Sequence, residues 1–226
     1  MTNEIMKQET LARPIPRTPS RELINFSRIA SFVLHPLFMT SGAAFIMYKL
    51  SPAEFSTASS ISFQKWFRII VLFTILLPFV SILIFRIAGL VSNARMHQPR
   101  DRILPLLATI VFYSAAFILF SFCYNIPSLF CSLLLASSCD IILIFIVNFF
   151  YKVSVHTSAA AILISTSIIL LINKKIPVVL FLSMWLVAIA VGMVRWLLGA
   201  HTMGQILLGY TIGIIMQLSV YFIFYA

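Results

Sequence analysis

Long apolar segments constrain the fold of this 226-residue chain more than any other feature of its sequence. A helix of about 20 mostly apolar residues spans the hydrocarbon core of a bilayer. The sequence therefore predicts an all-α, polytopic transmembrane helical bundle with about six to seven spanning helices. The predicted segments are Phe26–Leu50, Phe67–Val91, Leu104–Cys123, Ile126–Phe149, Thr157–Ile172, Ile176–Val194 and Met203–Tyr225.

Composition excludes a water-soluble domain. Hydrophobic residues make up 61% of the chain and charged residues only 10%, whereas soluble domains carry about 25% charged residues. The net charge is +10, and the basic residues flank the apolar segments, where they set topology and contact anionic lipid headgroups. Because no basic surface is interleaved with aromatic residues, we do not expect nucleic acid as a partner.

The polar N-terminus and the apolar remainder divide the chain into two parts. Residues 1–25 are polar and contain three prolines, so we expect a flexible tail without a cleavable signal peptide. Residues 26–226 are expected to form a single transmembrane helical domain.

Three features inside the apolar segments predict how the helices pack. The pair His35–Pro36 is expected to bend the first helix. Gly209 and Gly213 give the last helix a small-xxx-small face that allows close approach of a neighbour. Asp140 lies deep in the fourth segment, and we expect it to be protonated or to have a polar partner.

Three polar clusters interrupt the apolar pattern, at Arg95–Arg102, Lys152–His156 and Arg195–Gln205. Two crossings separate the first cluster from the second, and two more separate the second from the third. All three are therefore expected on the same side as the N-terminus. Because ionisable side chains are costly at a membrane, this grouping predicts one anion site at one membrane face.

In the first cluster, Arg95 and Arg102 are seven residues apart, close to two helical turns. Two guanidinium groups that converge on one point suit a phosphate, which accepts bidentate hydrogen bonds. His97, Arg100 and Asp101 are candidates for a headgroup contact, and Asp101 is also placed to orient a neighbouring arginine. The alternative is a basic loop that only sets topology.

In the second cluster, Thr157 or Ser158 is expected to cap the fifth helix, whose N-terminus would then face an anion. Lys152 would add charge and Ser154 a hydroxyl group. His156 would donate a proton to a leaving alkoxide, because an imidazole titrates near neutrality. The alternative is an interfacial histidine and lysine without a chemical role.

In the third cluster, His201 and Gln205 are four residues apart and so share one helix face. Gln205 is expected to accept a hydrogen bond from one ring nitrogen of His201, which frees the other nitrogen for nucleophilic attack. Arg195 would hold the phosphoryl oxygens during that attack. The alternative is an arginine at a helix end beside an interfacial histidine.

Together, the clusters resemble the type-2 phosphatidic acid phosphatase family, whose pattern is Lys-x6-Arg-Pro, then Pro-Ser-Gly-His, then Ser-Arg-x5-His-x3-Asp. The resemblance covers about residues 95–205, and its third motif is the most specific part. Arg95 stands at the Lys of the first motif, and the positions that match the family's other functional residues are Arg102, Ser154, His156, Arg195 and His201.

The resemblance implies a role for each residue. His201 would attack phosphorus to give a phosphohistidine, His156 would protonate the departing alcohol, and Gln205 would orient His201. The phosphate-binding residues would be Arg95, Arg102, Lys152, Ser154 and Arg195. Neither a metal nor a cofactor is expected, because cationic side chains supply the electrostatic stabilisation.

The main departure from the family pattern is Gln205, which stands where the family has Asp. A neutral amide orients a histidine but does not stabilise its cationic form as a carboxylate does. The chain is thus predicted to be a divergent member, or an inactive descendant that binds or transports anionic lipid.

These observations predict a membrane phosphatase that hydrolyses a lipid-linked phosphate monoester or diphosphate. A lipid phosphotransferase that uses the same phosphohistidine is the near alternative. We expect an integral protein of a bacterial inner membrane, with the substrate entering from the lipid. Basic residues near both faces leave only a small preference for a cytoplasmic tail and site.

Overall fold

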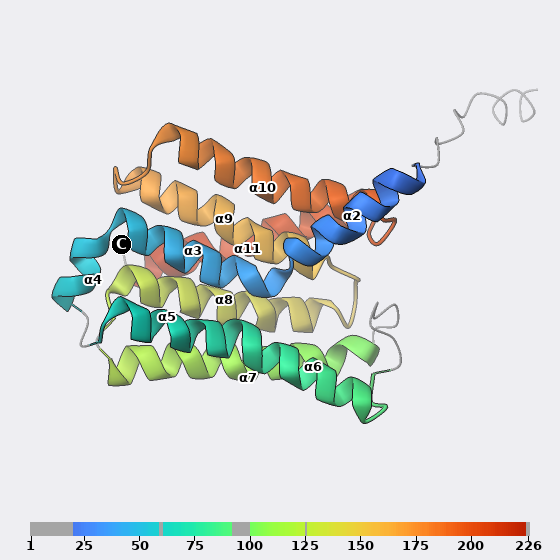
Figure 1. The fold of residues 1–226 in the computed structure, drawn as a ribbon, viewed down its shortest axis with the longest axis horizontal. Helices are drawn as coiled ribbons and strands as arrows, with labels where there is room; N and C mark the ends of the chain where they lie inside the picture. The colour runs from blue at the N-terminus through green and yellow to red at the C-terminus, as the bar shows by residue number, and fades with distance from the viewer. Residues whose placement is uncertain (1–19, 59–60, 92–99, 125, 225–226) are drawn as a thin grey trace, which may run out of the picture.

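The computed structural model describes residues 20–58, 61–91, 100–124 and 126–224. These ranges contain helices and no strand, so the chain is an all-α bundle, as predicted (Figure 1). The elements are α2 (Arg21–Val33), α3 (Pro36–Leu50), α4 (Pro52–Ala58), α5 (Phe63–Val71), the π-helical η1 (Leu72–Leu76), α6 (Leu77–Ile87), α7 (Arg100–Cys123), α8 (Ser128–Val147), α9 (Val155–Ile172), α10 (Val178–Leu197) and α11 (Met203–Phe224).

Six helices in the described ranges are long and apolar enough to cross a membrane. One of them is the continuous stretch Phe63–Ile87, which joins α5, η1 and α6, and the other five are α7 to α11. The pair α2 and α3 makes a seventh crossing if the two helices form one broken span. The predicted count of six to seven spans is therefore confirmed.

The first predicted span is bent by 56° between α2 and α3. Pro36 begins α3 and has no N–H to continue the helix across the break. His35 caps α3, because its Nδ1 accepts a hydrogen bond from the N–H of Leu37 at 3.3 Å. The bend predicted at His35–Pro36 is confirmed.

Helix α9 is the centre of the bundle, with 72% of its spanning window buried, and it packs against α3, α8, α10 and α11. Its contact with α11 depends on two glycines. A Cβ atom at Gly209 would lie 2.7 Å from the Ser154 carbonyl oxygen, and one at Gly213 would lie 2.6 Å from Cβ of Ala161. The predicted small-xxx-small face is therefore the surface on which α11 approaches α9.

Asp140 has a polar partner inside the bundle, as the sequence predicted. The hydroxyl of Ser158 on α9 donates a hydrogen bond to its Oδ1 at 2.6 Å, and both residues are buried. This bond joins α8 to α9 and gives a partner to the Asp140 side chain, which would be costly to bury alone.

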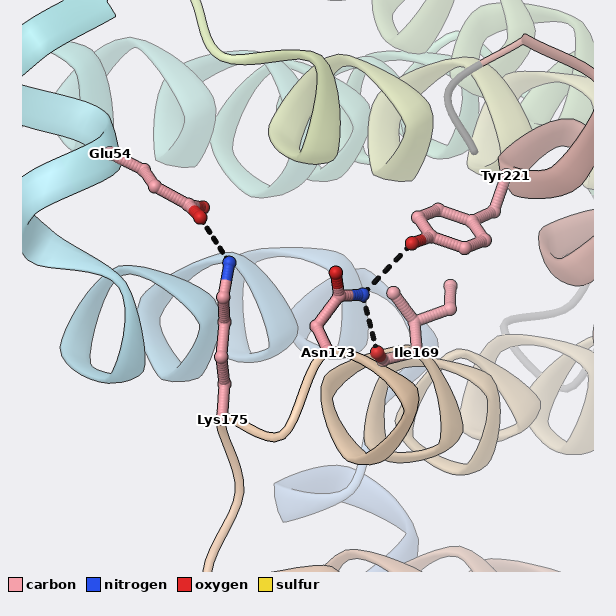
Figure 2. Close-up of polar contacts among 5 residues, drawn as sticks. All are labelled: Glu54, Ile169, Asn173, Lys175 and Tyr221. Carbon is pink, nitrogen blue, oxygen red and sulfur yellow. Dashed lines mark hydrogen bonds and ion pairs between the residues drawn. The ribbon is translucent and has the colours of Figure 1, made fainter.

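The two ends of the bundle differ in their chemistry. One end carries α2, the start of α7 and the connections α8–α9 and α10–α11 (Figure 1). At the opposite end, Figure 2 shows Lys175 paired with Glu54 of α4, and the side-chain amide of Asn173 donating to Tyr221 Oη at 2.8 Å. These contacts tie α4 and α11 to the α9–α10 turn.

Candidate functional site

The structure brings the described parts of the three polar clusters to one end of the bundle. Asp101 and Arg102 lie in the first turn of α7, Lys152 and His156 flank the start of α9, and Arg195 lies in the last turn of α10. The predicted residues Arg95 and His97 lie outside the described residues. Arg100 is the first residue of α7.

A glycine turn places the third cluster. Gly199 has a φ of 61°, and the N–H of Ala200 bonds to the carbonyl of Arg195 at 3.1 Å. This is a Schellman-type end, which needs a left-handed residue and so favours glycine. The chain reverses within a few residues and brings His201 back to the start of α11.

The predicted hydrogen bond between His201 and Gln205 is confirmed, with 3.1 Å between His201 Nδ1 and Gln205 Oε1. The same oxygen accepts the backbone N–H of Thr202 at 3.3 Å. Because a backbone N–H can only donate, the amide oxygen faces both groups, and Nδ1 of His201 carries the proton. The lone pair of the neutral ring is therefore on Nε2.

Gln205 has a second, structural function. Its backbone N–H bonds to Thr202 Oγ1 at 3.4 Å while its side chain accepts the N–H of Thr202. This reciprocal pair is a capping box, which satisfies two donors at the start of α11. The amide that orients His201 is thus itself fixed by the helix end.

The surroundings of His201 keep its ring neutral. Burial and the positive charge of Arg195 lower its pKa to about 4, with smaller contributions from Lys152 and Arg102. The hydrogen bond to Gln205 acts in the opposite direction. At neutral pH the histidine therefore has an unprotonated Nε2 next to cationic groups.

Arg195 has one satisfied and one unsatisfied part. Its Nη1 donates to the hydroxyl of Ser31 on α2 at 2.9 Å. Its Nε is buried and has no acceptor among the residues that the structure describes. A buried guanidinium N–H without an acceptor is unfavourable, and an anionic oxygen is the group that satisfies it best.

Lys152 joins the second cluster to the third. Its Nζ donates to the carbonyl oxygen of Ala200 at 3.0 Å, directly before His201. Burial, with the charges of Arg102 and Arg195, lowers the pKa of Lys152. An ammonium group has three donors, so this contact leaves the lysine with the capacity to bind an anion as well.

The expected cap of the fifth helix is wrong by three or four residues. Ser154 caps α9, and its Oγ accepts the N–H of Thr157 at 3.4 Å. Thr157 cannot fill that place, because its hydroxyl bonds instead to the carbonyls of Ser154 and Ile206, each at 3.0 Å. Ser154 has no exposed surface, and its predicted contact with phosphate stays a prediction.

His156 is the second residue of α9 and belongs to a group of histidines. Its ring lies edge to face with that of His35, with 5.5 Å between centroids and 72° between planes. It also interacts electrostatically with Arg195 and His201. The two histidines with predicted catalytic roles thus both interact with the charge of Arg195.

Three contacts in the site were missed by sequence reasoning. Ser31 of α2 holds Arg195, His35 contacts His156, and Asn148 at the end of α8 accepts a hydrogen bond from Arg102 Nη1 at 3.3 Å. A polar residue next to a helix break or end was the only sequence signal for them.

The described part of the site combines positive charge with an unprotonated ring nitrogen. Arg102, Lys152 and Arg195 supply positive charge, and His201 supplies a free nitrogen lone pair. Within the described ranges, no three His, Cys, Asp or Glu side chains are grouped to hold a metal ion. No protein-family model, curated protein or solved structure matches the chain.

Proposed function

We propose that this protein is a membrane phosphatase that hydrolyses a lipid-linked phosphate monoester or diphosphate through a phosphohistidine. Two observations carry the proposal: the buried Nε of Arg195 has no acceptor among the described residues, and His201, whose pKa the charge of Arg195 lowers, is neutral with an unprotonated Nε2. A phosphoryl oxygen satisfies the first group, and the phosphorus atom is the electrophile for the second.

In the first step, Nε2 of His201 forms a bond to phosphorus while the bond from phosphorus to the alcohol oxygen breaks. His156 acts in its imidazolium form and gives a ring proton to that oxygen, so a neutral alcohol leaves and the ring becomes neutral. In the second step, water attacks phosphorus and the P–N bond breaks, while His156 takes a proton from the water. Inorganic phosphate departs, and both histidines return to their starting states.

Positive charge lowers the barrier to both steps. Arg195, Lys152 and Arg102 act together on His201 in the free protein, and the same field would stabilise the charge on the equatorial oxygens in the transition state. Gln205 keeps accepting the Nδ1–H of His201 throughout, which fixes the ring for in-line attack.

The position of the site next to lipid-facing side chains supports a lipid substrate. Trp196 follows Arg195 directly and is 56% exposed, and Phe32 follows Ser31 and is 71% exposed. In a bundle of spanning helices, such apolar surface faces the bilayer. A phosphate on an acyl or isoprenyl chain can therefore reach Arg195 from the side.

Gln205 also favours a second candidate function. Because the amide does not stabilise a cationic His201, the site is suited to holding an anionic lipid without turning it over. A lipid phosphotransferase differs from the phosphatase only in the acceptor of the second step, which would be a lipid hydroxyl group in place of water.

Phosphate release from purified protein tests the proposal. We would compare wild-type protein with His201→Asn, which keeps a donor for Gln205 but has no Nε2, on phosphatidate, an isoprenyl diphosphate and a phosphorylated glycolipid. Lys175→Ala, at the opposite end of the bundle, is the matched control. We expect release by wild type and Lys175→Ala only, with an acid-labile phosphoenzyme in the wild type.

Three results would contradict the proposal. Release that His201→Asn leaves unchanged would exclude the phosphohistidine. Tight binding of the lipid phosphates without release by any form would favour the anionic-lipid binding protein, and transfer of phosphate to an added lipid alcohol would favour the phosphotransferase.

A further inference from the structure

The break between α2 and α3 brings a fourth segment to the site, outside the three polar clusters. Ser31 contacts Arg195, and His35 contacts His156. These contacts reach residues more than one hundred positions later in the chain. The first span therefore takes part in the site because it is bent, since the bend leaves His35 outside both helices.

The protonation state of His35 follows from its helix cap. Its Nδ1 accepts the N–H of Leu37 at 3.3 Å, and a backbone N–H can only donate. The ring is therefore neutral in this conformation, with its single proton on Nε2. Because the cap holds one edge of the ring to the start of α3, the orientation of the ring is fixed as well.

The contact between His35 and His156 restricts the second ring. Their centroids are 5.5 Å apart and their planes meet at 72°, which is the edge-to-face arrangement that aromatic rings favour. Two charged imidazolium rings at this distance would repel each other. With His35 held neutral by its cap, His156 is the member of the pair that can take up and release a proton.

We propose that His35 is a positioning residue of the site, which holds the His156 ring so that its proton faces the leaving oxygen. The inference rests on the proposed function, because His156 is the general acid of that reaction. His35 itself neither contacts the phosphorus nor exchanges a proton with the substrate in this scheme.

The dependence on the leaving group separates this role from a general effect on folding. An alkoxide is a poor leaving group and needs a proton from a well-placed acid, whereas p-nitrophenolate leaves without one. Loss of the positioning residue should therefore slow release from an alkyl phosphate much more than release from p-nitrophenyl phosphate. A residue that only supports the fold would slow both reactions equally.

The test compares kcat for phosphatidate and p-nitrophenyl phosphate in His35→Asn, His35→Ala, His156→Ala and the double variant His35→Asn/His156→Ala. Asparagine is a favoured helix cap, so His35→Asn keeps an acceptor for Leu37 while it removes the ring. We expect its alkyl-to-aryl ratio of kcat to fall by about tenfold, a fraction of the 10²- to 10⁴-fold effect of general-acid catalysis.

In His156→Ala the ratio should fall further, and the double variant should show no additional fall, because residues that act through one another are not additive. An unchanged ratio in His35→Asn would overturn the proposal, as would an equal loss with both substrates. The proposal would also be overturned if the fall in the ratio in the double variant equalled the product of the falls in the two single variants.

Failure of the underlying function gives a different result. If wild-type protein releases no phosphate, or if His201→Asn releases it normally, the phosphatase and the role of His35 fall together. If His201→Asn is inactive while His35→Asn keeps the wild-type ratio, only the role of His35 is wrong.

Discussion

The side-chain oxygen of Gln205 lies 3.1 Å from Nδ1 of His201 and holds the ring in one tautomer without adding a charge to it. A carboxylate at this position would do both. The amide thus provides orientation without charge, and burial together with the cationic neighbours of His201 keeps its pKa at about 4. The proposed nucleophile therefore differs from a catalytic histidine that is hydrogen-bonded to a carboxylate.

Replacing Gln205 with Glu should raise turnover near neutral pH by about tenfold. The isosteric carboxylate stabilises the positive ring that forms when His201 is phosphorylated, and a rise of one unit in the pKa of that ring corresponds to a factor of ten. Glutamate also serves in a capping box, so the start of α11 should be preserved. The pH profile of kcat should show its acid limb at higher pH, because the carboxylate raises the pKa of His201.

Gln205→Asp is the matched comparison, because aspartate has the same charge on a side chain that is shorter by one methylene group. We expect it to raise turnover less than Gln205→Glu does. Equal turnover in wild type and both variants would mean that His201 does not become cationic during the reaction.

The depressed pKa of His201 also predicts how stability depends on pH. Between its ordinary value of 6.5 and about 4, the unfolded chain binds a proton that the folded chain does not. Stability is therefore lost as the pH falls through this window, by about 2 kcal/mol at pH 5. Melting in detergent at pH 7.5 and pH 5 would measure this loss.

In His201→Asn the difference between the two melting temperatures should be smaller than in wild type, because the titrating ring is gone. The comparison uses differences within each protein, so it does not depend on what the substitution itself does to stability. An equal acid sensitivity in both proteins would show that other groups cause the loss.

The spans and the local contacts could be predicted from the sequence, because both depend on short-range patterns. Apolar length alone fixes a spanning helix, and a spacing of four residues puts Gln205 beside His201. The bend at His35 followed from Pro36, whose missing N–H is a local property.

The partners of the site residues could not be predicted, because they depend on which helices pack together. Ser31 and Arg195 are separated by 164 positions, and no periodicity connects them. The predicted cap of α9 was wrong for the same reason, since the hydroxyl of Thr157 bonds to the carbonyl of Ile206 on another helix. Packing decided both contacts.

Arg195→Lys should lower kcat/KM by about 100-fold, as for loss of one oxyanion-binding donor. Lysine keeps the charge but lacks the buried Nε, which has no acceptor among the described residues, and the planar fork that reaches Ser31 at 2.9 Å. Ser31→Ala should cost much less, because it removes only the group that holds Nη1. Initial rates on a lipid phosphate would measure both, and similar losses would mean that the contact with α2 matters more than Nε.

At the opposite end of the bundle, Lys175→Ala should leave kcat/KM unchanged and cost less than about 1 kcal/mol of stability. Its ion pair with Glu54 is partly exposed, with 25% and 45% of the two side chains accessible. Activity assays and melting curves would check the two expectations. A large loss of activity would show that the α9–α10 turn is coupled to the site.

Gly213→Ala should destabilise the bundle, whereas Gly42→Ala should not. A Cβ atom at Gly213 would collide with the carbonyl of Ser158, which is backbone and cannot turn aside, while a Cβ atom at Gly42 meets no atom within 4 Å. Overpacking of this kind costs about 1–3 kcal/mol, and we expect a lower melting temperature in detergent for Gly213→Ala alone. Since Ser158 also donates to Asp140, the strain should spread to α8 and lower activity as well. Equal melting temperatures for the two variants would mean that α9 and α11 are not packed as closely as the glycine contacts indicate.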